Sequence, residues 1–285
     1  MKTRMNFKDE FYQKLKLLVL PIAIQNFMLA LVSATDAIML GWIDQTSLSA
    51  VSLAGQVQFV LNLFITGIAA GAGIMAAQYW GKGDILAVER IFAFVTKVTT
   101  VISLIFTLSA LLLSGMLMRI FTNDPHVIAE GVKYLRIVAC SYIIMGITNV
   151  YLYVMRSIER VIVATVVYLV SFLCNVVFNA IFIFGLFGFP ALGIRGAAIA
   201  TLIARIMELV LVCGYAKIYN KDVKFRVHYF LHQDKLLVKD FLVYSLPVVL
   251  NEVMWGLGTS ANTAVLGHMG SSAVAANSVA QVARS

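Results

Sequence analysis

The stretch LVSATDAIMLG places a carboxylate, Asp36, inside a run of apolar residues. A charged side chain at the centre of a bilayer costs at least about 2.5 kcal/mol, so its presence calls for a function, a partner or water. Three more polar side chains, Asn175, Asn179 and Thr201, lie in similarly apolar segments. A carboxylate, two amides and a hydroxyl are hard oxygen ligands that suit Na⁺, by analogy with other hard cations. They are equally suited to hold a proton on Asp36 by hydrogen bonding.

These side chains lie on segments that are long enough to cross a bilayer. Of the 285 residues, 61% are hydrophobic and 13% are charged, whereas soluble domains carry about 25% charged residues. Runs of about 20 apolar residues span a hydrocarbon core about 30 Å thick. The sequence therefore predicts an all-α polytopic membrane protein with seven spans: Leu15–Trp42, Val51–Trp80, Ile91–Arg119, Tyr134–Met155, Val161–Phe187, Ile194–Tyr219 and Phe241–His268.

Basic residues are distributed unevenly between alternate loops. One set comprises the N-terminus and every second loop, with Lys2, Arg4, Lys8, Lys14, Lys16, Lys82, Arg90, Arg156, Arg160, Lys217, Lys221, Lys224, Arg226, Lys235 and Lys239. The opposite loops hold only Arg119, Lys133, Arg136 and Arg195. The positive-inside rule then predicts a cytoplasmic N-terminus. The expected location is the plasma membrane, the inner membrane of the cell, as a multi-pass protein. The net charge of +8 is thus a topology signal, and no nucleic-acid partner is expected.

The depth of each polar residue follows from the helical rise of 1.5 Å per residue. Asp36 should lie about 9 Å below the outer end of the first span. Asn175 and Asn179, spaced i, i+4 on one face, should lie about 10–18 Å below the same level, and Thr201 about 10 Å. These four residues therefore share one level in the outer half of the membrane. They predict either a functional site or a buried polar cluster that holds the helices together.

Other polar residues within the spans have simpler interpretations. Arg205 and Glu208 are spaced i, i+3, which predicts a self-neutralising intrahelical pair or, alternatively, a gating element. Glu252, in the inner half of the seventh span, is a candidate proton site or one member of a buried ion pair. The cysteines have no paired spacing and suggest buried small hydrophobic residues rather than disulfides or a metal site.

The seventh span resembles the first. LPIAIQNFM (20–28) aligns without gaps with LPVVLNEVM (246–254), and LGWIDQTSLSAVSLA (40–54) aligns with LGHMGSSAVAANSVA (266–280). Asn262 then falls opposite Asp36. Both copies start on the same side of the membrane, which indicates a parallel repeat of six spans, although chance similarity between apolar helices is an alternative. Such repeats build transporters with a substrate site between two bundles.

The repeat predicts three regions. Residues 1–219 form a six-helix N-terminal lobe, residues 220–240 an amphipathic cytoplasmic linker, and residues 241–285 the start of a second lobe, with its first helix and the beginning of the next. The expectation is that a complete second lobe needs about five more helices than the sequence holds, so that the chain is truncated.

Six stretches, in their order along the chain, resemble the multidrug and toxic compound extrusion (MATE) transporters. They are Pro21 followed by Asp36 and LG (40–41), AAQYWGKGD (76–84), YLRI (134–137), NVVFN (175–179), GLFGFPALGIRGAAIAT (185–201) and LPVVLNEVMW (246–255). The resemblance implies twelve helices in two lobes around a central cavity. It also implies export of bulky, often cationic, amphipathic drugs or toxins in exchange for inward Na⁺ or H⁺.

The resemblance also implies a coupling-ion site at Asp36, Asn175, Asn179 and Thr201, which would bind Na⁺ if the transporter is sodium-coupled. Tyr134, which is predicted to open the fourth span, belongs to the same implied network. Some family members have an aspartate at the position of Asn179, so the choice of ion does not carry over. Other members carry an acid in the seventh span at a variable spacing, which makes Glu252 a second-lobe candidate.

The function expected is therefore transport and not catalysis. No P-loop, HExxH, GxSxG or Cys/His metal pattern occurs, and no cofactor is expected besides the coupling ion, Na⁺ or H⁺. The expected partners are small-molecule drugs or toxins and the lipid bilayer, with a monomer if the chain is complete. One alternative is a flippase for a lipid-linked precursor, although the spans offer only Arg205 and Lys97 for its pyrophosphate. Another alternative is a truncated membrane protein that transports nothing.

Overall fold

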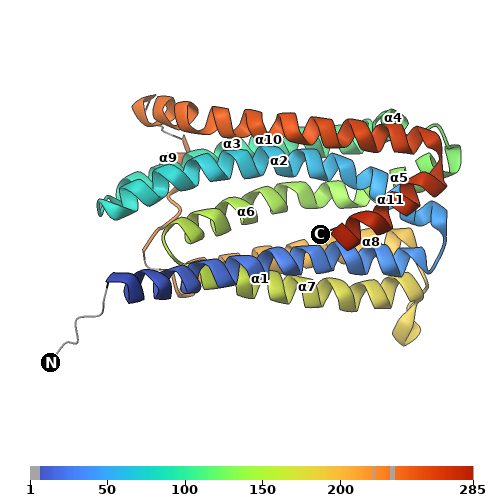
Figure 1. Cartoon of the computed structure of the whole chain (residues 1–285), viewed down its shortest axis with the longest axis horizontal. Coiled ribbons are helices and arrows are strands. Elements are labelled where there is room, and N and C mark those ends of the chain that lie inside the picture. Colours follow the sequence, from blue (N-terminus) through green and yellow to red (C-terminus); the bar gives the residue numbers. More distant parts are fainter. Residues whose placement is uncertain (1–6, 221, 232–234, 285) are drawn as a thin grey trace.

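A computed structural model of the chain describes residues 7–220, 222–231 and 235–284, all of whose regular elements are helices (Figure 1). Seven helical segments of this part of the chain are long and apolar enough to cross a membrane, as the sequence predicts. The elements, in order, are α1 (Phe7–Gly41), α2 (Gln45–Gly81), α3 (Ile85–Leu112), α4 (Ser114–Phe121), α5 (Pro125–Val138), η1 (Ala139–Ser141), α6 (Tyr142–Ser157), α7 (Val161–Phe184), η2 (Leu186–Gly188), α8 (Ile194–Ile218), α9 (Val227–Leu231), α10 (Lys235–Met269) and α11 (Ser271–Arg284).

The long helices run side by side along the long axis of the molecule (Figure 1). Helix α7 packs against α8 on one side and α1 on the other, and α2 packs against α3, α5, α6 and α10. Apolar side chains of these helices form two core clusters, one around Leu61 and Leu135 and the other around Ile91 and Leu152. Helix α1 is less buried than the other long helices, because only 6% of its most apolar 18-residue segment is buried.

Acidic residues in the turns cap the helices that follow them. The Asp44 carboxylate accepts the backbone N–H of Ser47 at 2.6 Å, and Asp84 caps α3 in the same way. Asp124 caps α5 and is followed by Pro125, a residue well suited to a first helical turn. These carboxylates satisfy the free N–H groups at helix starts. Asp36 has no such role because it lies within α1.

Several helix bounds differ from those predicted, because capping rather than hydropathy sets where a helix begins. The fourth span starts at Pro125 instead of Tyr134 and passes through the short 3₁₀ turn η1 before α6. Tyr134 therefore lies well inside α5 and does not open the helix. The third span ends at Leu112, and α4 is a separate helix.

Part of the predicted linker, residues 220–240, is helical. It contains α9 and the first residues of α10, while residues 221 and 232–234 lie outside the described part of the chain. Glu89 on α3 holds the linker: its buried carboxylate pairs with Arg226 at 2.7 Å and accepts the N–H of Lys224 at 2.9 Å. The domain boundary at residue 241 stays a prediction.

The internal repeat is visible in the helices. Helices α1 and α10 each contain a proline, Pro21 and Pro247, at aligned positions. Helices α2 and α11 begin at residues that are also aligned, Gln45 and Ser271. The Ser278 hydroxyl donates to the Ser52 hydroxyl at 2.8 Å, so one pair of aligned residues is in direct contact.

Glycines let α10 approach α2 closely. A methyl group at Gly71 would overlap Ser245, and one at Gly67 would lie 2.8 Å from the Val249 backbone. Small residues at such contacts allow the backbone approach on which helix association in lipid depends. The contact between α2 and α10 therefore requires the absence of a side chain at these positions.

We expect Gly71→Val to destabilise the protein by about 1–3 kcal/mol, because the added side chain forces α10 away from α2. The measurement is the midpoint of thermal unfolding in detergent. Gly55→Val on the same helix is the matched control, since a methyl group there meets nothing within 4 Å. Equal midpoints for the two variants would contradict the close packing described.

Candidate functional site

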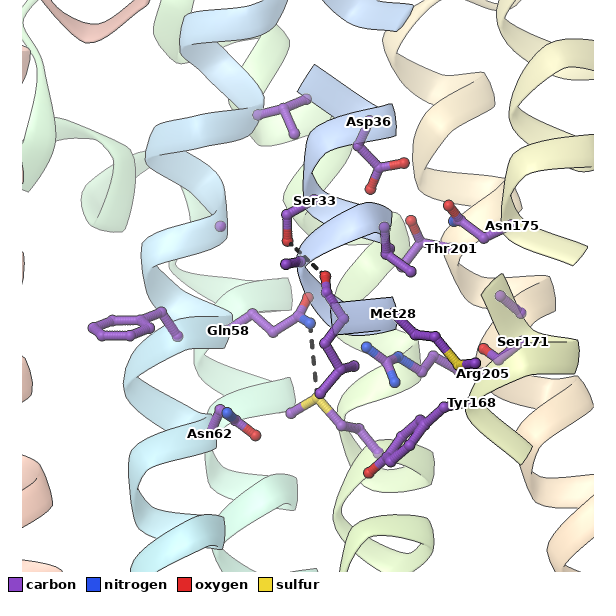
Figure 2. A pocket seen from close by; sticks show the side chains of 18 of the residues that line it. Met28, Ser33, Asp36, Gln58, Asn62, Tyr168, Ser171, Asn175, Thr201 and Arg205 are labelled. Atoms are coloured by element: carbon purple, nitrogen blue, oxygen red, sulfur yellow. Dashed lines mark hydrogen bonds between the residues drawn. The ribbon is translucent and has the colours of Figure 1, made fainter. Parts of the chain in front are cut away.

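A cavity of about 590 Å³ lies among α1, α2, α5, α6, α7 and α8, with Ser278 of α11 also in its lining (Figure 2). Four of the five residues predicted for the first-lobe site line it: Asp36, Tyr134, Asn175 and Thr201. The fifth, Asn179, lies behind them and is fully buried. Four different helices thus bring the predicted residues to one end of a single cavity.

The side chain of Asn179 links the carboxylate to the other amide. Its Nδ2 donates to Asp36 Oδ1 at 2.5 Å and to Asn175 Oδ1 at 3.1 Å. Its own Oδ1 is buried without a hydrogen-bond partner among the described residues. A carboxylate beside an unpaired buried carbonyl oxygen can receive a cation or a proton, because both would satisfy oxygen lone pairs that the protein leaves free.

Thr201 and Tyr134 complete the group. The Thr201 hydroxyl donates to the Ala197 carbonyl one turn earlier in α8, at 3.0 Å, so its oxygen remains available as an acceptor. The Tyr134 side chain lies next to Thr201 and within electrostatic reach of Asp36. The structure thus brings the five residues together, while their role as an ion site stays a prediction.

A second polar contact fixes α1 against α7. Gln25 is fully buried, and its Nε2 donates to the Val161 carbonyl at 3.1 Å and to the Thr165 hydroxyl at 2.7 Å. It lies 11 residues before Asp36, or about 16 Å along the helix. Gln25 is not among the residues predicted from the sequence, although an uncharged amide in an apolar span is itself a signal.

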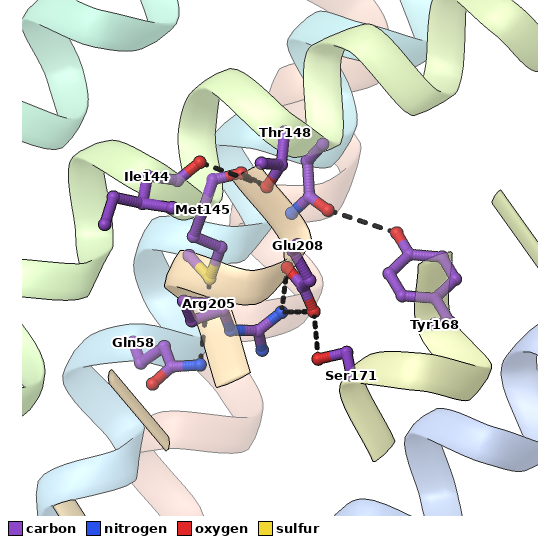
Figure 3. A network of polar contacts seen from close by, with 9 residues as sticks. Gln58, Ile144, Met145, Thr148, Tyr168, Ser171, Arg205 and Glu208 are labelled. Atoms are coloured by element: carbon purple, nitrogen blue, oxygen red, sulfur yellow. Dashed lines mark hydrogen bonds and ion pairs between the residues drawn. The ribbon is translucent and has the colours of Figure 1, made fainter. Parts of the chain in front are cut away.

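The predicted pair between Arg205 and Glu208 is confirmed. Arg205 Nη1 donates to both carboxylate oxygens of Glu208, at 2.8 and 3.0 Å (Figure 3). Glu208 also accepts the Ser171 hydroxyl of α7 at 2.7 Å, a contact between helices that the sequence did not predict. Next to this network the Tyr168 hydroxyl donates to Asn149 at 3.2 Å.

Arg156 is the principal correction to the sequence analysis. It was assigned to a loop, but it lies in the last turn of α6 and lines the cavity. Gln58 and Asn62 of α2 face the same cavity and were also missed (Figure 2).

Two further expectations fall outside this cavity. Glu252 is on α10 and is not among the residues that line it, so its second-lobe role stays a prediction. Cys140 and Cys213 are exposed rather than buried, because they lie on outward faces of their helices.

The contact between α1 and α7 can be measured with a double-mutant cycle of Gln25→Leu and Thr165→Val. We expect a coupling free energy of about 1 kcal/mol, because hydrogen bonds between membrane helices reach about 0.6–1.7 kcal/mol. The measurement is unfolding in a mixed-micelle titration. Phe27→Leu, at an exposed position of α1, replaces Gln25→Leu in the control cycle. Purely additive effects in the first cycle would show that the bond contributes nothing to the contact.

Comparisons with known proteins show the family and the fold of the chain. Residues 21–181 match the family model MatE. The probable multidrug resistance protein YoeA of Bacillus subtilis (strain 168) is 26% identical over 97% of this chain, and a probable multidrug resistance protein NorM of Rhizobium meliloti (strain 1021) is 32% identical over 65%. The chain spans about 60% of the length of YoeA and 40% of that of NorM.

Solved structures show the same fold. The MATE multidrug transporter DinF-BH superposes with a TM-score of 0.84 at 21% identity, over 99% of this chain and 63% of that one. An inward-facing MATE family transporter superposes with a TM-score of 0.74 at 19% identity, over 94% of this chain and 60% of that one. At such identities the likeness concerns the fold alone.

Proposed function

Because the chain belongs to the MatE family, we propose that it acts in a cation-coupled antiporter that exports bulky, often cationic, amphipathic compounds by alternating access. The observation that carries the proposal is the Asp36 cluster, where a carboxylate and an unpaired amide oxygen meet in an apolar helical bundle at the end of a cavity. Relatives described as probable multidrug resistance proteins support the substrate class.

The cluster explains how an ion could drive the cycle. Na⁺ or H⁺ binding at Asp36 would neutralise its charge and compete for the oxygen that now accepts from Asn179. An ion that binds one arrangement of the helices more tightly than another shifts the equilibrium toward it by that difference in free energy. Asn175, Thr201 and Tyr134 would supply the remaining oxygen atoms around a bound Na⁺.

The cavity suits a small organic molecule. Its volume of about 590 Å³ lies within the range of about 300–1,000 Å³ that is typical of small-molecule sites. Its charged lining residues are two acids, Asp36 and Glu208, and two bases, Arg156 and Arg205. This balance argues against a flippase, which needs a strongly basic cavity for pyrophosphate.

The membrane location, the orientation and the oligomeric state of the protein are part of the same proposal. A cytoplasmic N-terminus rests on the distribution of lysine and arginine between alternate loops. In that orientation the Asp36 cluster lies in the half of the membrane nearer the outside. The plasma membrane is proposed as the location because a drug exporter acts there. A monomer is proposed as the transporting unit if the chain is complete.

We expect Asp36→Asn to lower efflux of the cationic dye rhodamine 6G from cells at least tenfold, because the amide cannot carry the charge that binds the ion. The asparagine can still accept from Asn179, so insertion into the membrane should be unchanged. Asp44→Asn is the matched control, since asparagine also caps helices and Asp44 lies outside the cavity. Undiminished efflux by the Asp36 variant at equal protein level would refute the assignment.

The identity of the ion follows from thermal unfolding of the purified protein with NaCl in place of choline chloride. If Na⁺ is the coupling ion, it raises the unfolding midpoint of the wild type but not of Asp36→Asn, because binding to the folded state alone stabilises it. If the midpoint is insensitive to Na⁺ and rhodamine 6G efflux follows a pH gradient, the coupling ion is H⁺.

A further inference from the structure

The charges of the cavity are separated along its length. Asp36 lies at one end, joined to Asn179 of α7. Arg156 lies toward the other end, with its guanidinium 5.8 Å from the ring centre of Tyr168, also on α7. Tyr168 and Asn179 are 11 residues apart in one helix, which separates the two ends by about 16 Å. The cavity therefore has an acidic end and a basic end.

The middle of the cavity carries no free charge. Arg205 and Glu208 neutralise each other through two hydrogen bonds, and Ser171 occupies one of the Glu208 oxygens (Figure 3). A ligand there would meet an ion pair whose partners are already satisfied. Charged groups on a ligand are thus directed to the two ends.

The charge of Arg156 is not neutralised by any residue that the structure describes. No ion pair of Arg156 occurs within the part of the chain that the structure describes, and its Nε is buried without a hydrogen-bond acceptor. The nearby basic residue Arg160 pairs instead with Asp222 at 2.8 Å. Because Arg156 lines the cavity without an acidic partner, a ligand that brings an anion to its guanidinium gains a charge-assisted interaction on binding.

Two tyrosines hold the guanidinium in place. It lies 5.0 Å from the ring centre of Tyr153, one turn earlier in α6, and 5.8 Å from that of Tyr168. Stacking on aromatic rings fixes the plane of an arginine while leaving its edge free for paired hydrogen bonds. Carboxylates and phosphates match that edge, because two of their oxygens can accept two parallel N–H groups.

We propose that Arg156 is an anion-binding residue of the cavity, which selects amphipathic ligands that bear a carboxylate over otherwise identical ligands that do not. The inference rests on the proposed function and narrows its substrate class. The cationic part of a zwitterion lies toward Asp36 and its carboxylate against Arg156, with the apolar body between them. A purely cationic ligand gains nothing from the basic end.

The test compares two dyes that differ in one group: rhodamine 6G, an ethyl ester, and its free acid, which carries a carboxylate. Binding to the purified protein in phosphatidylcholine nanodiscs is followed by fluorescence anisotropy. The wild type should bind the acid more tightly than the ester. Arg156→Gln should weaken acid binding about tenfold or more while leaving ester binding unchanged, and Arg156→Lys should restore part of the loss. Arg160→Gln, at the exposed neighbouring arginine, should change neither.

The outcomes separate this inference from the function on which it rests. If the ester and the acid bind equally well, and Arg156→Gln affects both alike, the anion site is refuted while drug binding stands. If neither dye binds, the proposed function is refuted, and the inference with it.

A lipid phosphate is the other source of such an anion. Nanodiscs containing phosphatidylglycerol provide that phosphate. If phosphatidylglycerol abolishes the preference of the wild type for the acid, and does not change dye binding to Arg156→Gln, the guanidinium binds a lipid phosphate. The small-molecule assignment is then overturned. If the wild type prefers the acid equally in both kinds of nanodisc, the small-molecule assignment is supported.

Discussion

The hydrogen bond from Asn179 to Asp36 joins α1 to α7 at the level of the candidate site. Lipid is as apolar as a leucine side chain, so helices in a membrane gain little from burying apolar surface against each other. Helix α1 buries little of its surface, and α7 holds it by polar bonds at two levels, Gln25 and Asp36. The carboxylate that would bind an ion is therefore also an attachment point of a helix. An ion that binds this carboxylate oxygen would compete with the hydrogen bond from Asn179 and so weaken the attachment of α1 to α7.

Much of this arrangement could be predicted from sequence because membrane helices obey simple geometry. Apolar length predicts the seven spans, and a fixed rise per residue places Asp36 level with Asn175 and Asn179 on a parallel neighbour and with Thr201 on an antiparallel one. The contact from Asn179 to Asp36 bears out that calculation, and the i, i+3 spacing of Arg205 and Glu208 likewise predicted their ion pair. Depth alone cannot say which side chains donate or accept, and the central role of the Asn179 amide emerges only from the structure.

The errors have physical reasons as well. Helix starts were misplaced because Asp44 and Asp124 extend α2 and α5 beyond their apolar runs by capping free N–H groups. Arg156 was assigned to a loop because a cation normally ends an apolar segment. Side chains on a helix lean toward its N-terminus, so an arginine in the last turn of α6 reaches back to Tyr153 and into the cavity. A hydropathy pattern shows where an arginine joins the backbone, but it does not show where the guanidinium at the end of the side chain lies.

The contact between Ser52 and Ser278 has a consequence for the symmetry of the protein. A parallel repeat relates its two halves by rotation about an axis along the membrane normal. A residue that touches its own counterpart lies beside that axis, as at an isologous interface between identical subunits. The crossing of α2 and α11 therefore lies beside the axis that would relate the two aligned segments, residues 40–54 and 266–280.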